Sequence, residues 1–317
     1  MRFDCVYFGR ALRAMEERLR TRDLTVYLTW DLRELPTYGD DVVAVVLGDE
    51  ESRRPVYADS VRAVFKCSGA RPWIGSALLR RRTYLSLLIF LQGARRWLRH
   101  LPDDLRVLRR RLQGRRPRPV EHLPLGYYNQ LDLPLTDFDA RRTAVFFAGS
   151  LERMQRSRLS PRRWLRMPKS VARQEMLDAL GEYRRRRPEV PLNPAADSEL
   201  CVDHPGGRRA LFRELMDARI CLAPRGTNAE TYRFFEGLRY GCVVITERLP
   251  PTGFYAGAPA IVVDRWRELP DLLESLLDAP AELRRRHRRS LAWWRDRCSE
   301  AATGALMAER VDAWGAE

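Results

Sequence analysis

The stretch LAPRGTNAETYRFFEGLRYGCVV, residues 222–244, decides the fold. It predicts the end of a strand, a turn, an amphipathic helix and a second buried strand. Thr227 and Glu230 have the spacing of a capping box, so the helix is expected to begin at Thr227. Gly241 stands where a glycine commonly ends a helix. This succession of strand, helix and strand is typical of a parallel α/β sheet.

The turn inside this stretch has the chemistry of an anion-binding site. Gly226 lets the backbone approach a ligand closely, and the helix that follows directs its first N–H groups at the same place. Arg225 adds a fixed cation, and Thr227 and Asn228 complete the turn. We therefore predict a binding site for a phosphate or diphosphate at residues 225–228.

The polar residues of the helix have two interpretations each. Glu230 is expected to cap the helix rather than to act as a catalyst. Arg233 and Glu236 share a flank that differs from the apolar face of the helix. They form a surface ion pair or, because ligands bind at the carboxyl edge of a parallel sheet, part of the binding site.

The composition fits a soluble globular protein with a large excess of basic residues. The 317 residues carry a net charge of +15, and among the 57 basic residues only Lys66 and Lys169 are lysine. Such a charge attracts phosphorylated sugars, nucleic acid or an anionic membrane surface. A chain of this length accommodates two domains of ordinary size.

The cysteines and the N-terminus bear on localisation. The six cysteines form no C-x-x-C pair and no metal-binding spacing, so buried free thiols in a reducing compartment are expected. The N-terminus has no signal peptide, and no apolar run approaches the roughly 20 residues of a spanning helix. We expect a cytoplasmic protein, with peripheral contact at the inner membrane surface as a further option.

Strand and helix patterns alternate in the first third of the chain. Strands are expected at residues 3–8, 24–29, 41–48 and 61–66, and a helix at 10–21. Residues 77–114 predict one or two helices that Pro102 breaks. The basic, proline-containing stretch 114–128 is expected to be a linker.

A second series of strands and helices begins with TAVFFAGS at residues 143–150. Further strands are expected at 219–223 and 260–263, with helices at 170–186, 208–217, 267–278 and 281–313. This pattern predicts an N-terminal domain over 1–127 and a C-terminal domain over 128–300. The last residues, 301–317, are expected to form a helix that packs back on the N-terminal domain.

The 222–244 stretch resembles the donor-binding signature of exostosin-like glycosyltransferases. In that family a Pro-Arg/Ser-Gly turn precedes a helix that carries an arginine and, after two residues, a glutamate; Gly-Cys and a buried strand follow. The resemblance is specific over residues 219–273 and weaker at 143–150 and 169–173. The family's proline after the start of the second strand is absent here, where Val243 and Val244 stand.

The resemblance implies an α/β fold of the GT-B type, with two facing Rossmann-like domains, parallel sheets and a cleft between them. It implies a hexosyltransferase-like enzyme of polysaccharide biosynthesis that moves a sugar from a nucleoside diphosphate, UDP by family resemblance. The acceptor hydroxyl is expected on a glycan, a lipid-linked molecule or a small molecule.

The resemblance also implies roles for individual residues. Arg225 and Gly226 match the turn that faces the diphosphate, with Thr227 and Asn228 beside them. Arg233 matches an arginine near the donor phosphates, and Glu236 matches a glutamate that accepts hydrogen bonds from the ribose. Further donor-binding residues are expected across the sheet edge and on a neighbouring helix: Gly149, Ser150, Lys169 and Arg173.

The chemistry of transfer sets further expectations. No D-x-D pair accompanies the donor motif, so neither a metal nor another cofactor is required; arginines and helix N–H groups stabilise the leaving diphosphate instead. Asp49 and Glu50 are the candidates for the base that deprotonates the acceptor, since they follow an apolar strand. A solvated acidic loop is the alternative. Lys66 and His204 are further candidates for the acceptor site.

Three other classes of function stay open, and one of them is a non-catalytic protein that binds a sugar nucleotide at the same phosphate site. The basic clusters at 80–82 and 110–118 suggest a protein that binds or modifies nucleic acid, although no aromatic residues interleave with them as a single-strand platform needs. The segment 84–101 is apolar and then basic, as in a helix that lies on an anionic membrane. Its alternative is a core helix with an arginine-rich solvent face.

Overall fold

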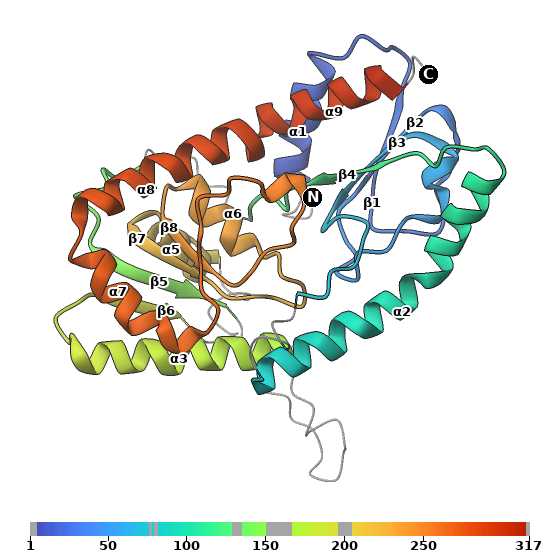
Figure 1. The fold of residues 1–317 in the computed structure, drawn as a ribbon. Helices are drawn as coiled ribbons and strands as arrows, with labels where there is room; N and C mark the ends of the chain where they lie inside the picture. Colours follow the sequence, from blue (N-terminus) through green and yellow to red (C-terminus); the bar gives the residue numbers. More distant parts are fainter. Residues whose placement is uncertain are drawn as a thin grey trace. The chain divides into compact units, whose positions relative to one another are not determined.

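The structure, a computed structural model, describes residues 5–75, 78, 82–128, 135–149, 167–195 and 205–314 (Figure 1). The chain divides into two compact units, each made of more than one segment. Unit 1 comprises residues 1–82, 89–126 and 297–317, and unit 2 comprises residues 83–88 and 127–296.

Unit 1 contains a four-stranded parallel sheet in the order β1-β2-β3-β4. Its strands are β1 (Thr25–Thr29), β2 (Gly39–Val46), β3 (Val61–Cys67) and β4 (Val120–Leu123). On one face, Val42, Ala44 and Val46 pack with Tyr57 of a 3-10 turn, η1 (Val56–Asp59). The stretch 114–128, expected to be a linker, thus contributes the fourth strand, because β4 pairs in parallel with β3.

Two helices from opposite ends of the sequence pack together in unit 1. They are α1 (Cys5–Glu16) and α9 (Glu300–Trp314). The Tyr7 hydroxyl donates to the Cys298 carbonyl at 2.6 Å, across 291 residues of chain. The Trp314 ring of α9 stacks on Phe65 of β3, with ring centroids 5.9 Å apart. The C-terminal helix therefore belongs to the core of unit 1.

The prediction of a strand at residues 3–8 is wrong over its described part, which begins α1. Tyr7, Phe8, Ala11 and Met15 are buried and recur at helical spacing. A short apolar run is compatible with either structure, and here the partner α9 selects the helix. The helix expected at 10–21 accordingly begins earlier and ends at Glu16.

Helix α2 (Tyr84–Leu112) runs without interruption through Pro102, so the predicted break is wrong. Proline removes the N–H that would bond the carbonyl of residue 98. Both Leu98 and Pro102 are exposed, so water can satisfy this carbonyl. The first residues of α2 belong to unit 2 and the remainder to unit 1.

Unit 2 contains a five-stranded parallel sheet in the order β6-β5-β7-β8-β9. Its strands are β5 (Thr143–Ala148), β6 (Leu192–Ala195), β7 (Ala218–Ala223), β8 (Val243–Thr246) and β9 (Ile261–Val262). The sequence patterns did not predict β6. It is an edge strand, which tolerates the missing N–H of Pro194.

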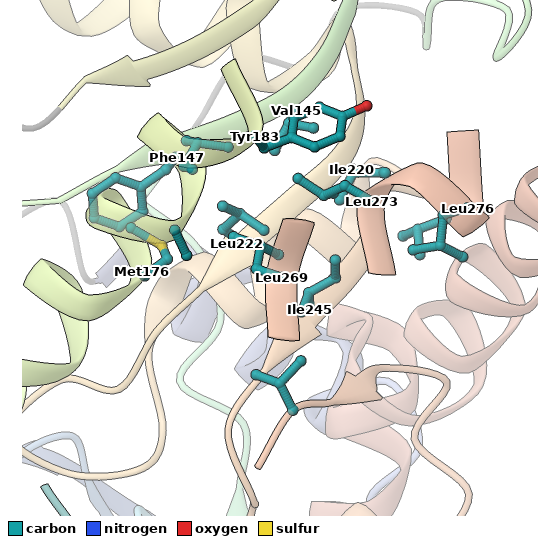
Figure 2. Packing of buried hydrophobic residues seen from close by; sticks show 14 of the residues in the cluster. Val145, Phe147, Met176, Tyr183, Ile220, Leu222, Ile245, Leu269, Leu273 and Leu276 are labelled. Atoms are coloured by element: carbon teal, nitrogen blue, oxygen red, sulfur yellow. The ribbon is translucent and has the colours of Figure 1, made fainter. Parts of the chain in front are cut away.

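Helices lie on both faces of this sheet. They are α3 (Pro168–Arg186), α5 (Pro205–Met216), α6 (Tyr232–Arg239), α7 (Leu269–Leu277) and α8 (Pro280–Trp293), with 3-10 turns η3 (Gly253–Tyr255) and η4 (Trp266–Glu268). Figure 2 shows Met176 and Tyr183 of α3 and Leu269 and Leu273 of α7 packed with Ile220 of β7. Helix α6 packs on β7 and β8.

The last helical segment differs from its expected form. A single helix was expected over 281–313, but the π-helical turn η5 (Trp294–Cys298) separates α8 from α9. The boundary between the two units falls inside this turn. Taken together, the two parallel sheets with their helices confirm the α/β class that was expected for a GT-B type protein.

Candidate functional site

The candidate site lies at the carboxyl edge of the sheet of unit 2. Three neighbouring strands, β5, β7 and β8, end just before Gly149, Arg225 and Glu247. Because the strands are parallel, these residues leave the sheet at the same edge. Open α/β sheets bind their ligands at this edge.

Arg173 of α3 reaches the end of β5. A Cβ atom added to Gly149 would lie 3.1 Å from an Arg173 guanidinium nitrogen, so the absence of a side chain at 149 leaves room for this cation. Lys169 precedes Arg173 by one helical turn on α3. The expected donor residue Ser150, next to Gly149, and the candidate His204 lie outside the described residues.

The buried Arg225 lies beside a half-buried carboxylate, Glu247, which the sequence patterns did not single out. Burial lowers the pKa of Arg225, and the neighbouring Glu247 opposes this shift. Burial raises the pKa of Glu247, and Arg225, Trp266 and Arg173 oppose that rise. The Trp266 indole N–H donates to Glu247 Oε1 at 2.8 Å. Arg225, Arg173 and Glu247 therefore form one charged cluster.

A sequence signal for Glu247 does exist. It directly follows the apolar strand β8, as Arg225 nearly follows β7. The rule that polar residues at the carboxyl ends of parallel strands meet would have selected it. Its partner Trp266 stands 19 residues further along the chain, and only tertiary packing brings the two together.

Helix α6 begins four residues later than predicted. Its N-cap is Thr231, whose hydroxyl accepts from the Phe234 N–H at 3.3 Å, so the expected capping box at Thr227 and Glu230 does not start the helix. Thr227 and Asn228 lie in the turn, where Asn228 Oδ1 accepts from the Ala229 N–H at 2.8 Å. This side-chain bond stabilises a turn in place of a helical start.

Gly226 is not sterically required at its position. A Cβ atom added there would lie 3.5 Å from Thr231 Cγ2, which is an ordinary contact. The glycine at the other end of α6 is required, because Gly241 has φ of +69° and follows the helix as predicted. The Cys242 N–H donates to the Gly237 carbonyl at 2.8 Å and closes this helix end.

Arg233 and Glu236 form an ion pair on α6 with 2.9 Å between Arg233 Nη1 and Glu236 Oε2. The pair is not at the surface, because Glu236 is buried and Arg233 lies 5.5 Å from the ring centroid of Phe146 in β5. Glu236 Oε1 accepts from the Tyr128 backbone N–H at 3.0 Å. The helix therefore presents a fixed cation and a fixed carboxylate.

The candidate bases Asp49 and Glu50 lie in unit 1, after β2. The Asp49 carboxylate is nearly buried and accepts from the Arg53 backbone N–H at 2.6 Å and from Arg53 Nε at 3.0 Å. It also lies 3.4 Å from the Nζ of the fully buried Lys66. Glu50, by contrast, is exposed. Asp49 and Lys66 thus hold the loop together.

The residues that the structure describes contain neither a metal-binding cluster nor a membrane-spanning helix. Within that part of the chain, no group of three or more His, Cys, Asp or Glu side chains is placed to hold a metal ion. Among the helices that the structure describes, none combines the length and the apolar character needed to cross a membrane.

Comparison with protein families finds a match over part of the chain, and this match supports a protein of the glycosyltransferase class. Residues 203–302 match the family described as the RXYLT1 C-terminal domain, which is exostosin-like. This segment includes β7, α6 and β8, and with them Arg225, Arg233 and Glu236. The exostosin-like resemblance predicted from residues 219–273 is confirmed.

Two solved structures are among those similar to the chain. One is the GtfA/B complex, with 9% identity and a TM-score of 0.46 over 88% of this chain. The other is the N-terminal domain of Candida albicans trehalose-6-phosphate phosphatase, with 12% identity and a TM-score of 0.46, covering 87% of this chain and 71% of the other. The chain spans 58% of the length of the GtfA/B structure. The comparison with curated protein sequences finds no match.

Proposed function

We propose that the chain transfers a sugar from a nucleoside diphosphate, UDP in the first instance, to a hydroxyl group of a glycan, a lipid-linked or a small-molecule acceptor. The observation that carries the proposal is the charged carboxyl edge of the sheet of unit 2. Arg173 and Arg225 gather there around Glu247, and Arg233 lies on the helix that follows β7.

The arginines suit a leaving diphosphate. Negative charge develops on this group as the bond to the sugar breaks, and cations already in place stabilise it without reorganisation. Arg173, Arg225 and Lys169 would supply this charge, together with Arg233 and the N–H groups at the start of α6. We therefore propose that transfer proceeds without a metal ion. Activity that persists in the presence of a chelator is the expected result.

Glu236 suits the ribose. Its two oxygens accept from the Tyr128 N–H and pair with Arg233, which fixes the carboxylate in one orientation. Each carboxylate oxygen has a second lone pair, so ribose hydroxyls can donate to the same group. The acceptor side is assigned to the loop after β2, where the exposed Glu50 is the proposed base and Asp49 its positioning neighbour.

Calorimetric titration with UDP, GDP, ADP, dTDP and CMP tests the donor site. We expect one diphosphate to bind and the variants Arg233→Ala and Glu236→Gln to weaken its binding roughly 10- to 100-fold, since each removes a charge-assisted hydrogen bond. Arg185→Ala, an exposed arginine on α3, is the matched control and should bind normally. Unchanged affinity in both site variants would refute the assignment.

A further inference from the structure

Helix α2 presents an apolar stripe to its surroundings. Bulky apolar side chains recur at alternating intervals of three and four residues along the whole helix: Tyr84, Leu87, Leu91, Leu98, Leu101, Leu105, Leu108 and Leu112, with Ala94 completing the series. Leu98, Leu105 and Leu112 are 60%, 64% and 81% exposed. Contiguous exposed apolar residues on this scale mark an interaction surface.

The opposite face of α2 is the one that packs, and it combines polar residues with apolar ones such as Leu85, which packs against the buried cluster of unit 2. His100 is buried, and its Nε2 donates to the Ala70 carbonyl at 3.0 Å. A Cβ atom added to Gly93 would lie 3.0 Å from the Ile74 Cα, so the helix lies close against the chain there. Asp103 is also buried on this face. The exposed leucines of the stripe therefore lie outside this packed face.

Positive charge borders the stripe. Residues 84–112 include seven arginines and two aspartates. Arg95, Arg109 and Arg111 flank the leucines directly and are exposed, whereas Asp104 is the acidic residue in the flanking positions. The exposed aromatic side chains Phe90 and Trp97 widen the stripe on one side.

We propose that α2 is a docking surface for an anionic membrane. A helix with leucine and tryptophan on one face and arginine beside it lies in the membrane interface, where acyl chains cover the apolar residues and anionic headgroups pair with the cations. A second copy of the chain fits less well, because its α2 would place three further flanking arginines against the first three. This surface binds a membrane whatever reaction the chain catalyses.

Flotation with lipid vesicles tests the proposal. We expect the full chain to float with vesicles that contain phosphatidylserine and to stay behind with phosphatidylcholine alone. The double variant Leu98→Glu/Leu105→Glu should abolish flotation. The triple variant Arg95→Gln/Arg109→Gln/Arg111→Gln should lower the partition coefficient roughly a hundredfold at low salt, given the contribution of each arginine at an anionic surface.

Two control variants make the same changes in charge at exposed positions outside α2. Val56→Glu/Leu135→Glu alters two exposed apolar residues outside α2, and Arg185→Gln/Arg267→Gln/Arg289→Gln alters three exposed arginines outside it. Both should float normally. Failure of the unmodified chain to float, or equal flotation of the Leu98/Leu105 variant, would overturn the proposal. Light scattering gives a further test. A dimer of the unmodified chain that the Leu98/Leu105 variant dissociates would also overturn the proposal, because the stripe would then bind a second copy.

Discussion

Individual side chains at the carboxyl edges of the two sheets have different roles. Arg233 and Glu236 are held by each other, and Glu236 also accepts from the Tyr128 backbone N–H. Asp49 is different, because its carboxylate is enclosed by Arg53 and the buried Lys66. Lys66 in turn donates to the Gly69 carbonyl at 2.7 Å. Asp49 therefore neutralises a buried cation, and the exposed Glu50 beside it is available for chemistry.

Separate substitutions of Asp49 and Glu50 distinguish a structural role from a catalytic one. Asp49→Asn should lower the free energy of unfolding by about 3 kcal/mol, because it leaves Lys66 as a buried charge without its counterion. Asparagine tolerates the φ of +75° at this position, so the loss reports on charge and not on backbone strain. Denaturant titration measures it, and an unchanged midpoint would show that the ion pair contributes nothing.

Glu50→Gln is the companion variant. Its free energy of unfolding should stay within about 0.5 kcal/mol of the original, as for most surface substitutions. If Glu50 is the base, kcat should fall roughly 100-fold or more. A normal kcat in this variant would exclude Glu50 and return the search for a base to the other residues of the loop.

Among the helices, α8 is joined to the end of α6 by one histidine. His287 Nδ1 donates to the Gly241 carbonyl at 2.7 Å, and its ring stacks on Phe138 with centroids 4.6 Å apart. Burial lowers the pKa of His287, and Arg141 and Arg288 lower it further, while the bond to Gly241 and the charge of Asp137 oppose the shift. The folded protein thus favours the neutral ring.

This shift predicts how stability depends on pH. Because the folded-state pKa lies below the ordinary value of 6.5, the contribution of His287 is complete above about pH 6.5 and is lost as the pH falls through the folded-state pKa. His287→Asn retains a donor for Gly241 but does not titrate. Its free energy of unfolding should therefore decline less than that of the original chain from pH 7 to pH 5.

The difference between the two pH curves is the quantity to measure. Glu175 and Glu247 have pKa values raised by burial, so their contributions have the opposite sign and fade as the pH rises. They cancel when the variant is compared with the original chain. Parallel curves would mean that His287 does not titrate differently in the folded and unfolded states.

At the scale of the whole molecule, two helices that lie far apart in the sequence, α1 and α9, pack together. Helix α9 follows the sequence of unit 2 and packs on α1, and the two helices are close together at Gly304. A Cβ atom added to Gly304 would lie 2.6 Å from the Ala11 carbonyl oxygen and 2.7 Å from the Met15 nitrogen. Both are backbone atoms, so one of the two helices would have to move.

Gly304→Ala should therefore destabilise the protein by about 1–3 kcal/mol, the usual cost of overpacking. The matched control is Gly181→Ala in the middle of α3, where a Cβ atom would meet nothing within 4 Å. That change should stabilise the protein by about 0.5–1 kcal/mol, because alanine is the better helix former. Thermal unfolding of both variants distinguishes them, and a stabilised Gly304→Ala would contradict the packing of α1 on α9.

Local patterns predicted the features that depend on neighbours in sequence. The buried face of α6 at Phe234, Phe235 and Leu238, the glycine that ends it and the buried strand β8 follow from helical and strand periodicity. The alternation of these elements predicted the α/β class. The motif that includes Arg225, Arg233 and Glu236 carried the exostosin-like resemblance, which the family match over residues 203–302 confirms, since its spacing is read within a single helix and its turn.

Contacts between distant segments decided the remainder. The apolar start of α1 suits a strand or a helix, and α9, nearly the whole chain away, selects the helix. Glu247 joins the arginines of the site only because Trp266 and three parallel strands bring them together. The amphipathic pattern of α2 is visible in its sequence, but the packing of its opposite face is what leaves Leu98, Leu105 and Leu112 exposed. Periodicity records which residues share a face, and only burial decides which face is covered.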